Sequence, residues 1–168
     1  MRVVDQISQA LGYVGAVMMF LTGVFLTYEV TARYAFRSPT TWAQEVSEIF
    51  LLWGVFLMVG FLIQKRANIA IDVLYAKVSQ NMQRTLDVIS LTFILVFLVL
   101  TVSAGSEMVM DSVMRGTTTG TMVDIPSYWE EAAVPFGCAW GAVQTIVEIF
   151  RAVTGRGWNP MINAGSEH

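Results

Sequence analysis

The sequence predicts an all-α integral membrane protein with four transmembrane helices and one interfacial amphipathic helix between helices two and three. Of its 168 residues, 55% are hydrophobic and only 14% are charged, and the mean hydropathy is +0.57. Soluble domains carry about 25% charged residues, and one water-soluble core would not bury this much apolar surface. Long charge-free runs over residues 6–28, 49–63 and 88–106 match the length of membrane spans. We expect residues 1–168 to form a single membrane domain.

Cysteine and histidine are almost absent, and this excludes several functions. Cys138 is the only cysteine, so no intrachain disulfide can form, and the only histidine is the last residue, His168. A haem-binding four-helix cytochrome, a histidine-ligated metal site and a Ser/His or Cys/His catalytic pair are therefore excluded. We predict that the protein is not an enzyme and uses no cofactor or metal, and we expect no nucleic-acid partner.

The first helix is expected over residues 10–36, after a short polar head over residues 1–9. Its apolar run is too long for the core of a cleavable signal peptide, so we expect it to remain as the first span. Gly12 and Ala16 are small residues four apart, and Gly23 adds another small position. This spacing permits close contact with another helix, although such residues are also ordinary in membrane helices.

The second helix is expected over residues 42–64. Pro39 interrupts the chain before it, because proline disfavours the helical conformation of the preceding residue. Thr41 and Gln44 have the spacing of a capping box. The helix begins with two carboxylates and is followed by two adjacent cations, so it has a direction across a bilayer.

Residues 68–82 are too polar to span a membrane, but their apolar residues approximate one helical stripe. We expect a helix in the headgroup plane, with a soluble connecting helix as the alternative. Four cations in and around this segment are candidates for lipid headgroup contacts: Lys65, Arg66, Lys77 and Arg84.

The third helix is expected over residues 84–114. It is apolar nearly all round in its middle, so we expect much of it to face lipid. A flexible threonine-rich loop over residues 116–121 follows.

The fourth helix is expected over residues 128–153. Ser127 and Glu130 have the spacing of a second capping box. Pro135 and Gly137 lie early in the helix, and we expect a kink there.

The distribution of cations predicts the orientation in the membrane. The two termini and the loop between helices two and three together carry seven cations, and the other side carries three. By the positive-inside rule, both termini are cytoplasmic.

Few residues are candidates for a site. Glu29 and Arg33 are four apart on the first helix, so we predict an ion pair near the outer interface. The alternative is that Glu29 is a proton or cation site, since carboxylates within membranes are usually functional.

A stripe on the second helix mixes an acid, two indoles and a glycine at helical spacing, so we predict that it contacts protein rather than lipid alone. Its members are Trp42, Glu45, Ile49, Trp53, Phe56 and Gly60. Three further carboxylates are expected on the outer surface: Glu48, Glu130 and Glu131. No charge lies deep within any span and no helix is broken at its centre, as transporter substrate sites often are. The chain therefore looks like one part of a larger assembly.

Several motifs, in this order and spacing, resemble those of one transporter family over residues 14–150. They are Trp42-x-x-Glu45, Trp53-x-x-Phe56-x-x-x-Gly60, Arg66-Ala67-Asn68-Ile69-x-Ile71-Asp72, Ile125-Pro126-x-x-Trp129 and Val134-Pro135-x-Gly137. The sequence resembles the small membrane subunit (Q subunit) of tripartite ATP-independent periplasmic (TRAP) transporters. Family members often have histidine where this chain has Asn68, which argues against an essential titrating group there.

The resemblance implies a scaffold function in the bacterial inner membrane. Such a subunit supports a large multi-span permease subunit that holds the substrate and sodium sites. A periplasmic binding protein delivers the substrate transiently, typically a C4-dicarboxylate, a sialic acid or another organic acid. On this reading the stripe of helix two contacts the large subunit, and Glu48, Glu130 and Glu131 lie near the docked binding protein.

Two alternatives belong to other classes. One is an autonomous small homodimeric transporter, coupled to protons or other ions through Glu29. The other is a four-span membrane enzyme or redox subunit, which the lack of histidine opposes.

Overall fold

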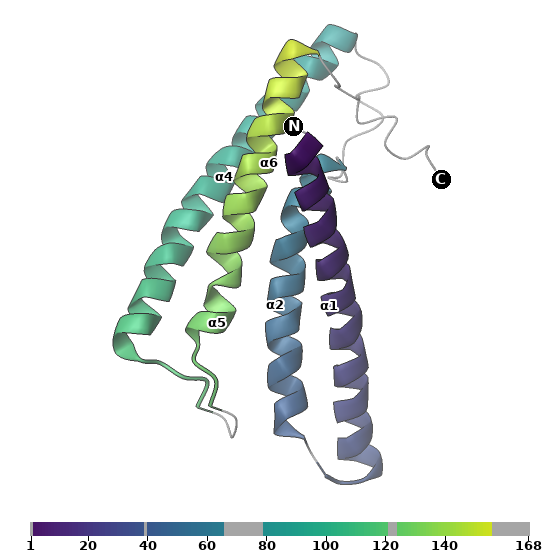
Figure 1. Ribbon diagram of the computed structural model, residues 1–168, viewed down its shortest axis with the longest axis vertical. Helices are drawn as coiled ribbons and strands as arrows, with labels where there is room; N and C mark the ends of the chain where they lie inside the picture. The colour runs from purple at the N-terminus through teal and green to yellow at the C-terminus, as the bar shows by residue number, and fades with distance from the viewer. Residues whose placement is uncertain (1, 39, 66–78, 121–123, 156–168) are drawn as a thin grey trace.

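A computed structural model of the chain describes residues 2–38, 40–65, 79–120 and 124–155. These residues form five helices (Figure 1): α1 (Arg2–Ala35), α2 (Thr41–Gln64), α4 (Gln80–Arg115), α5 (Tyr128–Glu131) and α6 (Ala133–Thr154). Within these ranges the only β-type pairing is an isolated bridge between Thr118 and Pro126. The all-α class is confirmed.

Four segments are long and apolar enough to cross a membrane, as predicted. They are Arg2–Ala35, Trp42–Gln64, Asn81–Arg115 and Tyr128–Thr154. The 36 residues of α4 extend about 54 Å at 1.5 Å per residue, so this helix is longer than the hydrocarbon core of a bilayer. The predicted surface helix over residues 68–82 falls mostly outside the described residues, and Gln80 onward already belongs to α4.

The long helices lie side by side in the order α1, α2, α6 and α4 (Figure 1). Helix α2 packs against α1 and α6, and α6 packs against α2 and α4, so α1 and α4 form the two edges. Consecutive long helices run in opposite directions, so the 36–38 and 116–120 segments lie at one end of the layer. The described helices thus form a layer one helix thick, which leaves both broad faces uncovered.

Helix α1 begins at Arg2, so residues 2–9 of the predicted polar head are part of the helix. Asp5 in its first turn favours this start, since carboxylates are stabilised near a helix N-terminus. After Ala35, Arg37 takes a left-handed conformation with φ 53°, and the chain turns towards α2 before Pro39.

Neither predicted capping box forms. The N-cap of α2 is Thr40, not Thr41, and no side chain caps the helix. Ser127 is the N-cap of α5 but has helical dihedral angles (φ −59°, ψ −28°), whereas a capping side chain needs an extended N-cap residue. At α2 the N-cap backbone is extended, but the N-cap position is held by Thr40, one residue before the predicted Thr41. At α5 the position is correct, but the backbone conformation required for capping is absent.

The helix of the last span is interrupted at a single residue, Ala132, whose backbone remains right-handed helical (φ −63°, ψ −22°). Helix α5 ends at Glu131 and α6 begins at Ala133. Pro135 has no N–H to bond the carbonyl four residues earlier, on Glu131, and its ring crowds that carbonyl. The kink expected at Pro135 therefore appears as an interruption one turn before it.

Glycines allow the helices to approach closely. A Cβ on Gly15 of α1 would lie 2.6 Å from the carbonyl oxygen of Gly54 on α2, and one on Gly137 of α6 would lie 2.4 Å from that of Phe56. Gly12 is also closely packed, against Phe61, but a Cβ on Gly23 would meet nothing within 4 Å. The predicted close contact thus forms at Gly12, but not at the exposed Ala16 or at Gly23, and Gly15 takes the place of Ala16.

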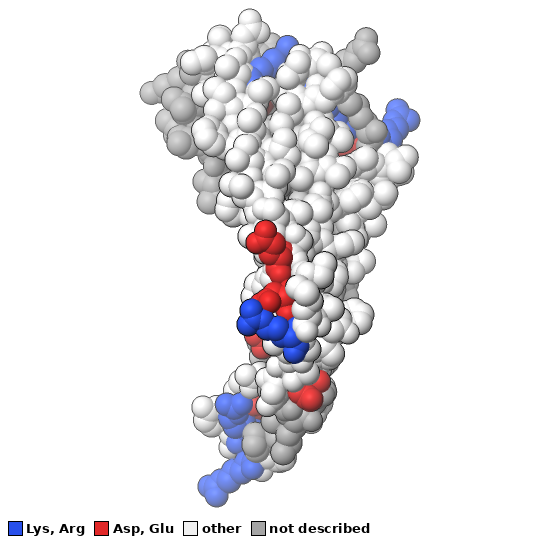
Figure 2. Space-filling view, turned by 90° about the vertical axis from the view of Figure 1, so that its left-hand side faces the viewer, with Lys and Arg blue, Asp and Glu red and all other residues white. Residues whose placement is uncertain are grey.

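The buried core is small, and most apolar side chains lie on the surface. Its fully buried centre is formed by Ile63 of α2, Leu91 and Leu98 of α4, and Cys138 of α6. On the side where α4 lies, a broad uncharged band crosses the molecule, and charged side chains gather below it (Figure 2). Phe97, in the middle of α4, is 67% exposed. Such surfaces require lipid or another apolar chain to cover them.

Candidate functional site

The stripe predicted on α2 faces α6 and α5 along much of its length. A Cβ on Gly60 would lie 2.7 Å from the indole of Trp140, and Phe56 packs on Gly137. The ring of Trp53 lies 5.8 Å from that of Phe136. Part of the protein contact that was predicted for this stripe is therefore made within the chain itself.

Trp53 also ties α2 to the short helix α5. Its indole Nε1 donates a hydrogen bond to the carbonyl oxygen of Trp129 at 2.9 Å. Trp42, at the start of the stripe, lies on the other side of α2, against the α1 rings of Phe25 (6.3 Å) and Tyr28 (6.0 Å). The side chain of Trp42 remains 45% exposed, so it is available to a second chain.

An acidic pocket of about 580 Å³ lies where α2 diverges from α5. Its carboxylates come from Glu45 and Glu48 in the first turns of α2, and from Glu130 and Glu131 in α5. Four carboxylates that the sequence analysis assigned to two different surfaces thus line one cavity. We call this cavity the acidic pocket, after these four residues.

Apolar and hydroxyl side chains complete the pocket wall. Leu52 of α2, Met108 of α4 and Val134 of α6 give the pocket an apolar wall, and Thr119 and Ser127 contribute hydroxyl groups. The pocket therefore combines carboxylates with an apolar wall.

Glu45 is the most deeply buried member of the pocket, with only 6% of its surface exposed. Neither of its carboxylate oxygens has a hydrogen-bond partner among the described residues, and the buried Oε2 of Glu131 also has none there. The dipole of α2 favours a carboxylate in its first turns by a few tenths to about 1 kcal/mol. Burying an unpaired ionised carboxylate costs several kcal/mol, so the dipole alone does not explain Glu45.

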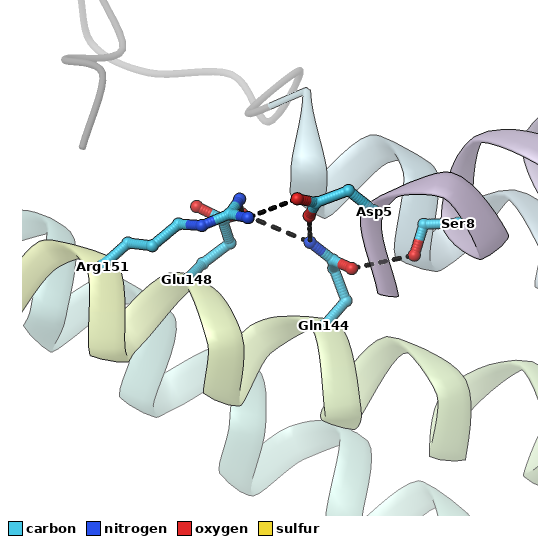
Figure 3. A network of polar contacts seen from close by, with 5 residues as sticks. All are labelled: Asp5, Ser8, Gln144, Glu148 and Arg151. Atoms are coloured by element: carbon cyan, nitrogen blue, oxygen red, sulfur yellow. Dashed lines mark hydrogen bonds and ion pairs between the residues drawn. The ribbon is translucent and has the colours of Figure 1, made fainter. Parts of the chain in front are cut away.

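A network of polar side chains joins the start of α1 to the last turns of α6 (Figure 3). Arg151 forms ion pairs with Asp5 and with Glu148, the latter at 2.6 Å. Gln144 donates to Asp5 at 3.3 Å and to Glu148 at 3.2 Å, and accepts a hydrogen bond from Ser8 at 2.8 Å. Each of these groups therefore has a partner on the other helix or on its own.

The sequence analysis missed this polar network. Gln144, Glu148 and Arg151 are spaced four and three residues apart, which places them on one helical face. Asp5 and Ser8 are three apart on α1. This spacing indicates a polar face on each of the two helices. The sequence does not tell which other helix meets that face.

Glu29 forms the predicted ion pair. It is buried, and the Nε of Arg33 donates to its carboxylate at 2.9 Å. The prediction of an ion pair four residues apart is confirmed.

Two of the four candidate lipid-binding cations can be placed. Lys65 is exposed at the end of α2, with its Nζ 6.0 Å from the centre of the Phe61 ring. Arg84 lies half-buried near Gly155, at the end of α6. Arg66 and Lys77 lie outside the described residues. Contact with lipid headgroups stays a prediction.

Among the described residues, no three Asp, Glu, Cys or His side chains converge closely enough to hold a metal ion. The four carboxylates of the acidic pocket concentrate negative charge without forming such a group.

These features define a multi-pass α-helical membrane protein, built as an open layer with an acidic pocket at one end. The model of one family, the DctQ component of tripartite ATP-independent periplasmic transporters, matches residues 22–155. The chain belongs to this family and is a small membrane subunit of a TRAP transporter. No curated protein matches the sequence significantly.

Proposed function

We propose that the chain is a non-catalytic scaffold subunit that supports a large multi-span permease subunit during sodium-coupled uptake of an organic acid. The main observation in support of this proposal is the open layer of α1, α2, α6 and α4, which is one helix thick and has apolar side chains exposed on it. A single layer does not enclose a path for a polar substrate, but it offers a broad apolar surface to a larger membrane chain.

The charge distribution supports the same proposal. The middle of each span is uncharged over residues 6–28, 49–63, 88–106 and 132–147. Charged substrates and coupling ions need polar or charged ligands within the membrane, and these are usually conspicuous in the spans that bind them. We therefore assign the substrate and sodium sites to the large subunit.

The proposed contact with the large subunit includes the exposed part of the α2 stripe, with Trp42 as its outermost anchor. Partly exposed aromatic side chains are frequent anchors of protein interfaces. Trp53, Phe56 and Gly60 support this surface from within, because they hold α6 against α2. We place the subunit in the bacterial inner membrane with both termini cytoplasmic. A periplasmic binding protein then delivers an organic acid near the outer acidic residues.

Co-purification from native membranes in a mild detergent tests the proposal. We expect a multi-span membrane protein of about twelve spans to accompany the chain, and Trp42→Ala to lower its recovery severalfold. Trp42→Phe keeps an aromatic ring and should preserve most of the recovery, provided that both variants reach the membrane in equal amounts.

Recovery of the chain alone, as a stable dimer that transports solute after reconstitution, would contradict the scaffold proposal. It would favour the autonomous transporter that uses Glu29. The ion pair between Glu29 and Arg33 argues against that function, because the carboxylate already has a cationic partner within the chain.

A further inference from the structure

We propose that the acidic pocket receives one cationic side chain, an arginine or a lysine, from a membrane-spanning partner chain. This inference rests on the proposed function, in which the chain works beside a larger membrane subunit. It adds the chemistry of one specific contact to that function and names the residues of this chain that make it.

The first argument is the state of Glu45. Its carboxylate lines the pocket, is almost completely buried, and has no hydrogen-bond partner on either oxygen among the described residues. Native proteins pair their buried charges, because an unpaired one loses its hydration without compensation. A cation that enters the pocket would supply the missing partner.

The second argument is the charge of the lining. The pocket has four carboxylates, Glu45, Glu48, Glu130 and Glu131, and no lysine, arginine or histidine among its described lining residues. The nearest cation along α4, Arg115, is paired with Asp111 at 2.8 Å and is not among those residues. The described part of the chain thus leaves the negative charge of the pocket uncompensated.

The third argument concerns the kind of cation. Calcium takes about six to eight oxygen ligands, and the described carboxylates do not converge into a group of three. The pocket is instead wide, with an apolar wall of Leu52, Met108 and Val134 beside the carboxylates. A long side chain suits this arrangement, because its hydrocarbon stem packs on the apolar wall while its charged end reaches Glu45.

The fourth argument concerns the partner. An unpaired buried carboxylate destabilises the subunit at all times, so a permanent neighbour compensates it better than a transiently docked protein. The four carboxylates also lie in the first turns of two candidate spans, Trp42–Gln64 and Tyr128–Thr154. A membrane-spanning chain beside α2 and α5 can therefore reach them from the side.

The test compares two measurements on the same variants, the affinity for the co-purified membrane partner and the melting temperature of the isolated subunit in detergent. For Glu45→Gln combined with Glu130→Gln, we expect association with the partner to weaken about tenfold or more. The melting temperature of the isolated subunit should stay unchanged or rise, because unpaired buried charge is removed. Glu107→Gln, on the exposed side of α4, is the matched control and should change neither.

A variant that binds the partner more weakly but melts no earlier has lost a contact with the partner, not a structural role within the subunit. If the double variant melts at a lower temperature when isolated, the carboxylates are structural and the proposal is overturned. Unchanged affinity for the partner also overturns it. If neither the wild-type chain nor Glu107→Gln retains a membrane partner, the proposed function itself fails, and this inference fails with it.

A titration with inorganic cations tests whether the pocket binds a protein side chain or an inorganic ion. The isolated wild-type subunit is titrated with sodium, calcium and magnesium chloride at constant ionic strength. We expect no rise in melting temperature that depends on Glu45. A saturable rise that Glu45→Gln abolishes would identify an inorganic cation site and overturn the proposal.

Discussion

Gln144 is fully buried in α6, yet all the polar atoms of its side chain have partners. Its amide nitrogen donates to Asp5 and Glu148, and its oxygen accepts from Ser8, which in turn accepts a 3.0 Å hydrogen bond from Trp140. Polar groups within an apolar environment are stable only when satisfied in this way. The network therefore holds the start of α1 against α6. Apart from this network, α1 makes few contacts with α6, because it packs mainly on α2.

Arg151 is the residue on which this network depends most. Arg151→Met should lower the free energy of unfolding by about 3 kcal/mol, because it leaves Asp5 and Glu148 without their cation. Denaturant titration in detergent measures this loss.

Arg115→Met is the control for the loss of Arg151. Arg115 also pairs with a carboxylate, but its side chain is 70% exposed, whereas that of Arg151 is 15% exposed. The control should cost less than about 1 kcal/mol, as exposed ion pairs do. Equal losses for the two variants would show that the network contributes no more than a surface ion pair.

At the scale of the helices, α6 is the central element, since it contacts α2 on one side and α4 on the other. Its contact with α2 depends on small residues that let the backbones approach. Gly137 lies directly against the carbonyl of Phe56, and Gly141 lies against Val59. Membrane helices associate mainly through such packing, because lipid is as apolar as their side chains.

Gly137→Ala should therefore push α6 away from α2. The added methyl group would overlap backbone atoms of Phe56, and we expect a loss of about 1–3 kcal/mol in the free energy of unfolding. Thermal or denaturant unfolding in detergent tests this expectation.

Gly23→Ala provides the control, because a Cβ at that position meets nothing within 4 Å. Alanine favours a helix over glycine by up to about 1 kcal/mol, so this variant should be neutral or slightly more stable. If Gly137→Ala behaved like Gly23→Ala, the close contact between α2 and α6 would not be important for stability.

At the scale of the whole molecule, the alternating direction of the helices separates its two ends. The 116–120 segment lies at the end where α1 passes to α2, and the C-terminal end of α2 lies at the other end (Figure 1). From the positive-inside rule we predict that the first end faces away from the cytoplasm.

Cysteine labelling checks this orientation in a chain that carries Cys138→Ala and is otherwise free of cysteine. In spheroplasts, Thr118→Cys should react with a membrane-impermeant maleimide, because residue 118 is exposed at the outer end. Lys65→Cys should react only after lysis. The reverse pattern would mean that both termini face outwards.

The four spans were predictable because their signals are local. A charge-free run indicates that a segment lies in the apolar core of a membrane, so the fold class follows from the sequence. Pro39 and Pro135 act on their immediate neighbours, so the break before α2 follows from it as well. The helical start at Arg2 was missed, because Asp5 and Ser8 are satisfied by residues more than 130 positions away, on α6. The capping boxes were wrong because spacing reveals neither the residue at which a helix begins, which decided the outcome at Thr41, nor the backbone conformation of the N-cap, which decided it at Ser127.

The placement of the α2 stripe and the gathering of four carboxylates emerged from the packing of the helices. An apolar face on a membrane helix looks the same in sequence whether it meets lipid, another chain or its own neighbour, because all three are apolar. Trp53, Phe56 and Gly60 meet α6 within the chain, while Glu45 and Glu130 approach each other across the gap between α2 and α5. Local sequence therefore specifies which segments enter the membrane, and only long-range packing specifies which of their faces meet.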